Sequence, residues 1–280
     1  MADPFQRYRG LEIAADAPGP GERAEVPYHA VGDLELHERS TAGDFARLAH
    51  AAIDGALARG RVPVVSGGTG LYLRAAVAEL GFPDEADPAV RAWAQELVAR
   101  DPAAALAELR ARDPGIAGRV DAANPRRLAR ALEVAAGPGR PEGGDALWSG
   151  AVRRPTLVVG LVRPREELDR RIAVRVGREL DDGLVAELRA AMAAPGVSRE
   201  ALQVIGAREV AAMDAGELDP AELPARLAAR TRRLARRQLA WLRKTPGVVP
   251  LDAGDAPAED ALPRLLALWR AEGDPVPSPG

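Results

Sequence analysis

The sequence has no cysteine, only one lysine and no apolar run long enough to cross a membrane. A chain without cysteine forms no disulfide and performs no thiol chemistry. A membrane-spanning helix needs about 20 apolar residues, so we expect no membrane partner. The residues after Met1 are polar and acidic and lack the apolar core of a signal peptide. These absences favour a cytoplasmic protein.

Histidine and net charge give little further indication of function. His29 and His37 do not have the spacing of metal ligands, which favours structural roles for both. The net charge of −3 does not indicate a nucleic-acid partner. Lys244 is the only lysine, so almost all positive charge is carried by arginine, whose guanidinium suits bidentate contacts with phosphate. At 280 residues the chain is long enough for one large core or a core with an inserted subdomain.

A glycine-rich turn stands between two predicted elements. The apolar run from Val62 to Val65 predicts a short buried strand, and the residues from Leu71 onward begin a helix. Between them lie Gly67, Gly68 and Gly70, which allow sharp turns and close approach of the backbone. One interpretation is an anion site at the helix N-terminus. The other is a tight strand-to-helix turn without a ligand.

Further patterns predict a parallel α/β core. A helix over 42–58 is capped by Ser40 or Thr41 and ends at Gly60, and residues 17–21 read as a loop. Two more strands are expected over 155–161 and 248–251. Helices are expected over 165–180, 184–192, 199–213, 220–243 and 263–271. Helices that alternate with short apolar strands are typical of a parallel sheet.

Residues 83–150 read as an all-helical insertion between core segments 1–82 and 151–280. Helices are expected to begin at Asp87-Pro88 and Asn124-Pro125, with two more over 102–111 and 113–120. No strand candidate occurs in this stretch. The glycine- and proline-rich residues 137–144 are expected to form a flexible linker, and the tail 274–280 to be disordered.

Arginine is concentrated on three predicted helices. Arg126, Arg127 and Arg130 share one face, and Arg171 with Arg175 lies one turn apart, followed by Arg178. The longest stripe holds Arg226, Arg230, Thr231, Arg232, Arg233, Arg236, Arg237, Gln238 and Arg243, and it ends beside Trp241. Such stripes indicate phosphate binding. The alternatives are a solvated helix face and, for Arg171 and Arg175, pairing with Glu166, Glu167 or Glu179.

Seven segments, in order, resemble those of the bacterial tRNA dimethylallyltransferase family. They are Asp-x-x-Gln-x-Tyr-Arg-Gly-Leu at 3–11, Val-Pro-Tyr-His at 26–29, Gly-Gly-Thr-Gly-Leu-Tyr at 67–72, Asp-Pro-Ala-Val-Arg at 87–91, Asn-Pro-Arg-Arg-Leu-Ala-Arg-Ala-Leu-Glu-Val at 124–134, Gln-Val-Ile-Gly-Ala-Arg-Glu at 203–209 and Thr-Arg-Arg-Leu-Ala-Arg-Arg-Gln-Leu-Ala-Trp-Leu-Arg at 231–243. The resemblance implies a P-loop NTPase-like α/β core with a helical tRNA-binding insertion. It also implies transfer of a dimethylallyl group from dimethylallyl diphosphate to N6 of adenosine-37, in tRNAs that read codons beginning with U.

The resemblance further implies roles for individual residues. Asp3 would be the general base for the N6 proton, and Gln6 would hold the edge of the extruded base. Arg175, beside Arg171, would neutralise the departing diphosphate together with Mg²⁺. Residues expected to contact the tRNA anticodon stem-loop are Asp3, Gln6, Thr69, Arg91, Arg126, Arg127, Leu128, Ala129, Arg130, Arg236 and Arg237. We identify no metal ligand in the sequence, and we expect a monomer.

The sequence also departs from the family pattern. Members begin with a strand and a P-loop, Gly-x-x-x-x-Gly-Lys-[Ser/Thr], which this sequence does not contain. We therefore expect the chain to be truncated at its N-terminus, with the first strand and P-loop missing. Pro4-Phe5 replaces a small polar pair, and Ala207 replaces a tyrosine. An alternative is a catalytically inactive RNA-binding remnant of the family. A small-molecule kinase relative is disfavoured by the missing P-loop lysine and the helical insertion.

Overall fold

The computed structural model describes residues 1–82, 86–137, 146–255 and 258–271, which divide into two compact units. The first unit is formed by residues 1–80 and 145–280, and the second by residues 81–144. The predicted linker over 137–144, apart from Gly137, and the predicted disorder of the tail lie outside the described residues. Among the helices described, none is long and apolar enough to cross a membrane.

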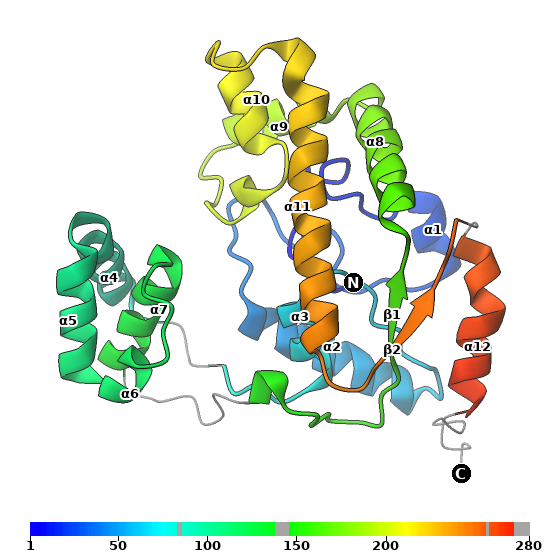
Figure 1. Cartoon of the computed structure of the whole chain (residues 1–280), viewed down its shortest axis with the longest axis horizontal. Helices are drawn as coiled ribbons and strands as arrows, with labels where there is room; N and C mark the ends of the chain where they lie inside the picture. The colour runs from blue at the N-terminus through cyan, green and yellow to red at the C-terminus, as the bar shows by residue number, and fades with distance from the viewer. Residues whose placement is uncertain (83–85, 138–145, 256–257, 272–280) are drawn as a thin grey trace. The chain divides into compact units, whose positions relative to one another are not determined.

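The first unit holds a two-stranded parallel sheet surrounded by helices (Figure 1). β1 (Val158–Val162) pairs with β2 (Val248–Asp252), with Val158 opposite Val248 and Val162 opposite Asp252. Its N-terminal helices are α1 (Pro20–Glu25), α2 (Ala42–Ala58) and α3 (Gly70–Val77). After β1 come α8 (Arg165–Asp181), α9 (Leu184–Ala193), α10 (Ala207–Asp214) and α11 (Leu223–Lys244), and α12 (Leu262–Ala271) follows β2. Single 3₁₀ turns are η1 (Ala146–Trp148), η2 (Ala201–Gln203), η3 (Pro220–Glu222) and η4 (Ala258–Ala261).

The long helix α11 runs from the helices α8 and α10 to the sheet of this unit (Figure 1). Its N-terminal half packs with α8 and α10 over a core that includes Leu184, Leu188 and Leu227, all about 1% exposed. Its C-terminal half reaches β1, where a Cβ on Gly160 would lie 2.6 Å from Leu242. A side chain at residue 160 would therefore require the Leu242 side chain or the helix to shift.

Over the residues that the structure describes, the second unit is a bundle of four helices with its own core. These are α4 (Pro88–Arg100), α5 (Pro102–Arg112), α6 (Pro114–Ala117) and α7 (Pro125–Ala136). Asp87, Asp101, Asp113 and Asn124 cap them by accepting backbone N–H bonds, and each is followed by a proline. This is the signature that marks a helix start in sequence. Leu109, Leu128 and Leu132, all 0% exposed, form the centre of the core.

Several predicted elements are confirmed. The helix over 42–58 has the predicted bounds, and Thr41 accepts a bond from the backbone N–H of Asp44 at 3.0 Å. The strands expected over 155–161 and 248–251 correspond to β1 and β2. The predicted helix starts at residues 88 and 125 are also confirmed. The helices predicted after β1, except the one over 199–213, have bounds within a few residues of those predicted.

Three predictions of secondary structure are wrong. Val62–Val65 forms no strand, and Val62 and Val64 are exposed. An apolar run becomes a strand only where a neighbouring strand pairs with its backbone. In the described chain the sheet consists of β1 and β2, which pair with each other and not with this run. The single helix expected over 199–213 is split into η2 and α10 by Gly206, whose φ of +105° interrupts the helix. The predicted loop over 17–21 contains the start of α1, which has Pro20 in its first turn.

Candidate functional site

The N-terminal loop holds Asp3 in a partly buried position. The backbone N–H of Ala2 donates to the carbonyl of Ser66 at 2.6 Å, which ties the loop to the segment before the glycine turn. One Asp3 carboxylate oxygen accepts a hydrogen bond from the backbone N–H of Phe5 at 2.8 Å. Burial raises the pKa of Asp3, although backbone N–H bonds from Phe5 and Gln6 oppose the shift. A desolvated carboxylate of this kind is a stronger base than one in water.

Gln6 is fixed with one half of its amide unused. Its Nε2 donates to the carbonyls of Ala15 and Asp16 at 3.2 and 3.0 Å, which sets the orientation of the amide. Its Oε1 is buried and has no hydrogen-bond partner in the described part of the chain. Buried acceptors are rarely left without a partner. The Gln6 oxygen is therefore suited to accept a hydrogen bond from a bound ligand.

Gln6 lines a pocket of about 590 Å³ in the first unit. Other lining residues come from the N-terminal loop, α1 and the end of α8, and include Tyr28, Arg178 and Glu179. Burial raises the pKa of Glu179 to about 7; Arg175 and Arg178 lower it, and Asp16 and Glu187 raise it. Asp3 is not among the lining residues, so the pocket lies beside the predicted base and does not contain it.

The predicted diphosphate-binding arginines on α8 are all engaged in ion pairs. Arg171 pairs with Glu167, as the alternative interpretation expected. Arg175 and Arg178 instead share Asp16, with Arg175 2.7 Å from its carboxylate. Asp16 has a positive φ of 48°, which is uncommon outside glycine. An anionic ligand at Arg175 must therefore compete with a carboxylate of the protein itself.

The glycine turn is packed against protein atoms. A Cβ on Gly67 would lie 2.4 Å from the carbonyl oxygen of Ala2, and one on Gly70 would lie 2.2 Å from the Trp241 ring. Gly68 likewise faces the Gln238 side chain on α11. These contacts explain the three glycines without a ligand, and they favour the second interpretation of the turn. Thr69 is the N-cap residue of α3, but its side chain makes no capping bond.

The arginine stripe of α11 divides into two halves. In the N-terminal half, Arg226 pairs with Glu222, Arg230 with Glu209 and Arg232 with Asp169. The arginines of the C-terminal half, Arg233, Arg236, Arg237 and Arg243, are exposed and have no ion pair with any residue that the structure describes. The glycine turn that carries Thr69 contacts α11 through Gly68 against Gln238 and Gly70 against Trp241. The predicted tRNA-binding residues Arg236 and Arg237 directly precede Gln238 on this helix.

The remaining predicted tRNA contacts lie in the second unit. Arg126 and Arg127 at the start of α7 are exposed; Arg127 is 3.2 Å from Asp121, and Arg130 is 2.9 Å from Glu133. Arg91 on α4 donates to the carbonyl of Ala86. Leu128 and Ala129 are buried in the core of the bundle, so their side chains support α7 while the arginines face solvent. These residues and Asp3 belong to different units.

Two features were missed from the sequence. Arg74 on α3 is only 3% exposed and donates to the carbonyls of Leu147, Ser149 and Ala151. Trp148, between those carbonyls, stacks on Trp241 with ring centroids 4.7 Å apart. An arginine in an otherwise apolar helix start was the available signal for Arg74. For Trp148 the only sequence signal is an isolated aromatic residue.

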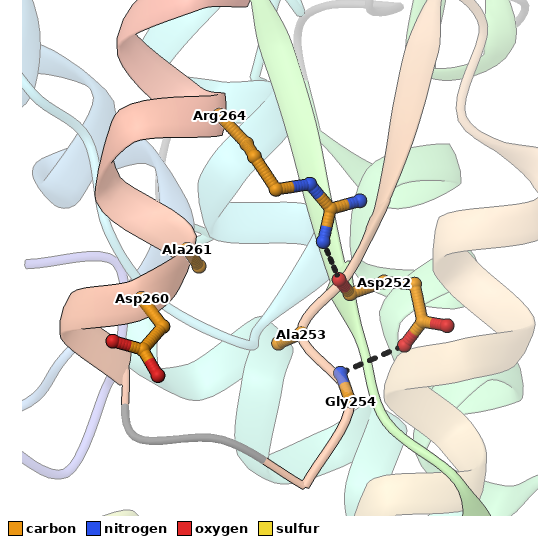
Figure 2. A pocket seen from close by; sticks show the side chains of 6 residues that line it. All are labelled: Asp252, Ala253, Gly254, Asp260, Ala261 and Arg264. Carbon is orange, nitrogen blue, oxygen red and sulfur yellow. Dashed lines mark hydrogen bonds between the residues drawn. The ribbon is translucent and has the colours of Figure 1, made fainter.

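A smaller pocket of about 210 Å³ lies beyond the end of β2 and contains none of the predicted site residues (Figure 2). Arg264 donates there to the carbonyl of Asp252, and the Asp252 carboxylate accepts the N–H of Gly254 (Figure 2). Within the described residues, no three His, Cys, Asp or Glu side chains cluster as metal ligands. The described residues therefore do not fit a metal site built from protein ligands alone.

The architecture is that of solved tRNA-modifying prenyltransferases. The structure superposes on the tRNA isopentenylpyrophosphate transferase of Bacillus halodurans with a TM-score of 0.69 and 27% identity, over 97% of this chain and 86% of that one. It also matches the fold of a eukaryotic dimethylallyltransferase described as acting on tRNA, with a TM-score of 0.76 over 99% of this chain and 73% of that one, at 24% identity.

Comparison of the sequence with known proteins points to the same family as the comparison of structures. Residues 6–245 match the family model described as IPP transferase. The tRNA dimethylallyltransferase of Salinispora arenicola is 41% identical over 278 residues, which cover 96% of this chain and 79% of that protein. That of Kineococcus radiotolerans is 42% identical over 275 residues, covering 95% and 84%. The chain belongs to the IPP transferase family.

Proposed function

We propose that the chain is a tRNA dimethylallyltransferase, which prenylates N6 of adenosine-37 in tRNAs that read codons beginning with U. The observation that carries the proposal is the N-terminal loop, where the desolvated carboxylate of Asp3 lies three residues before the unused acceptor of Gln6. Family membership supplies the reaction class. The match to proteins named for this activity does not favour an inactive remnant.

The chemistry assigns one role to each group. N6 of the adenine forms a bond to C1 of the dimethylallyl group, and the C1–O bond breaks with its electron pair passing to the diphosphate. Asp3 accepts the proton that N6 loses. Gln6 Oε1 accepts a hydrogen bond from a base that has left its stack.

The cationic residues bind the two charged substrates. Arg175 neutralises the departing diphosphate after exchanging its Asp16 partner for a phosphate oxygen. Mg²⁺, held mainly by water and phosphate oxygens, would enter with the diphosphate. The anticodon stem-loop is contacted by Thr69, Arg91, Arg126, Arg127, Arg130, Arg236 and Arg237. The charges of the arginines hold the RNA backbone without reading its sequence, and Thr69 contributes a neutral hydroxyl.

The test is a transfer assay with dimethylallyl diphosphate and an adenosine-37 tRNA, read by mass spectrometry of the digested nucleosides. We expect the wild-type chain to form N6-dimethylallyladenosine. Asp3→Asn keeps the size of the side chain but removes the base, so turnover should fall by at least about 100-fold, while tRNA affinity stays near that of wild type. Asp181→Asn, which neutralises an exposed carboxylate on α8, is the matched control.

Two results would contradict the proposal. No product from the wild-type chain, with both substrates bound, would leave an RNA-binding protein without transferase activity. Full turnover by Asp3→Asn would remove Asp3 from the role of base but leave the transferase reaction in place.

A further inference from the structure

The tryptophan pair is formed by Trp148 and Trp241, and Trp241 lies on α11 in the same half as the arginines that have no ion pair among the described residues. The two rings are 4.7 Å apart and tilted by 34°, and Trp148 remains 41% exposed. Lys244 Nζ lies 5.9 Å from the centre of the Trp148 ring. Arg237, Arg243 and Lys244, on the same half of α11, add positive charge. An exposed aromatic ring beside such charge is the composition that binds unpaired nucleotides.

The pair is held rigidly from the side of α3. Gly70 at the start of α3 allows the Trp241 ring to approach within a distance that a methyl group would block. Arg74, one turn later on α3, binds the carbonyls of residues 147, 149 and 151 on both sides of Trp148. A buried arginine with three carbonyl acceptors fixes a segment that has no sheet or long helix of its own. The Trp148 ring is therefore positioned before any ligand arrives.

We propose that Trp148 is a stacking platform for an unpaired nucleobase of the RNA. The inference rests on the proposed function for the nature of the ligand, but it concerns a contact that the transfer chemistry does not require. The unpaired arginines bind backbone phosphates of the same RNA segment, and the exposed ring receives one base. Because every base has a π-face, stacking contributes affinity with little preference for sequence.

The experiment measures RNA affinity for wild-type, Trp148→Ala and Trp148→Phe chains. The probes are a 17-nucleotide anticodon stem-loop and a blunt RNA duplex of the same number of phosphates. Loss of one stacked base corresponds to a ~5–150-fold weaker Kd, and we expect this for Trp148→Ala with the stem-loop only. Trp148→Phe should keep most of the affinity, since a smaller ring still stacks. Trp269→Ala on α12 is the control for a removed tryptophan.

A spectroscopic readout separates stacking from a structural role. 2-Aminopurine placed at successive loop positions loses fluorescence when it stacks on an aromatic ring. We expect one position to be quenched by the wild-type chain and by Trp148→Phe, and to recover with Trp148→Ala. Equal Kd values for wild type and Trp148→Ala would overturn the inference. So would equal weakening on the stem-loop and the duplex. Failure of the wild-type chain to bind either RNA would instead overturn the proposed function as well.

Discussion

The fold raises the pKa of the Glu179 carboxyl to near neutral pH. Its carboxyl lies in the pocket beside Gln6, where burial raises its pKa to about 7 from 4.5. Arg175 and Arg178 on α8 favour the charged form, and Asp16 in the N-terminal loop and Glu187 on α9 favour the neutral form. The folded state therefore holds this proton more tightly than the unfolded chain does.

The sign of the pH effect follows from that difference. The contribution of Glu179 to stability is fully present below about pH 4.5 and is lost as the pH rises to about 7. We expect Glu179→Gln to match wild type in urea unfolding at pH 4, below the window, and to be more stable than wild type at pH 8. Glu217→Gln, which changes an exposed carboxylate outside the helices, should change neither value. A Glu179→Gln chain no more stable than wild type at pH 8 would contradict the assigned burial penalty.

Asp16 illustrates what residue-level sequence reasoning could not predict. The helical spacing of Arg171, Arg175 and Arg178 was visible in the sequence, and so was the local alternative that Arg171 pairs with Glu167. The partner shared by Arg175 and Arg178 is Asp16, which comes from a loop far away in sequence and has an uncommon positive φ. Neither the long-range approach nor the backbone conformation leaves a periodic signal.

At the scale of elements, helix caps and apolar periodicity were sufficient to predict the helices and strands that depend on local sequence. α2 and α7 follow their N-caps and their apolar spacing, and β1 and β2 follow short apolar runs. The failures were non-local. Val62–Val65 had the composition of a strand without a partner in the described chain, and Gly206 interrupts a helical pattern where the backbone meets Leu188 on α9. Pairing and close approach are properties of the neighbours.

The contact between α3 and α11 yields a stability prediction. Gly70→Ala places a methyl group 2.2 Å from the Trp241 ring, so the helices must separate or Trp241 must leave its position. Overpacking of this kind costs about 1–3 kcal/mol. Gly177→Ala in α8 is the matched control, because a Cβ there meets nothing within 4 Å and should stabilise the helix by about 0.5–1 kcal/mol.

The measurement is the urea midpoint of each variant together with the fluorescence of the tryptophan pair. We expect Gly70→Ala to lower the midpoint and change the emission spectrum, and Gly177→Ala to raise the midpoint with an unchanged spectrum. A Gly70→Ala midpoint at or above that of wild type, with an unchanged emission spectrum, would refute the close packing of Gly70 against Trp241.

At the scale of the whole molecule, two units each carry exposed arginine on a helix with its own core. Arg126 and Arg127 lie on α7 of the helical unit, and Arg236 and Arg237 lie on α11 of the α/β unit. If both units bind the same tRNA, the phosphate contacts of each contribute separately to its salt dependence. The slope of log Kd against log salt then reports the number of contacts, at about 0.7–0.9 for each phosphate neutralised.

Three variants test this arrangement: Arg126→Ala with Arg127→Ala, Arg236→Ala with Arg237→Ala, and all four changes together. We expect each double variant to weaken tRNA binding and to lower the slope by up to about 2. Because the two arginine pairs belong to different units, the free-energy losses should add to within about 0.5 kcal/mol in the fourfold variant. Arg226→Ala with Arg230→Ala removes two arginines that are already paired with glutamates, and it should leave the slope near the wild-type value. If the fourfold variant bound tRNA with the same Kd as the double variant that binds less tightly, only one unit would bind the tRNA.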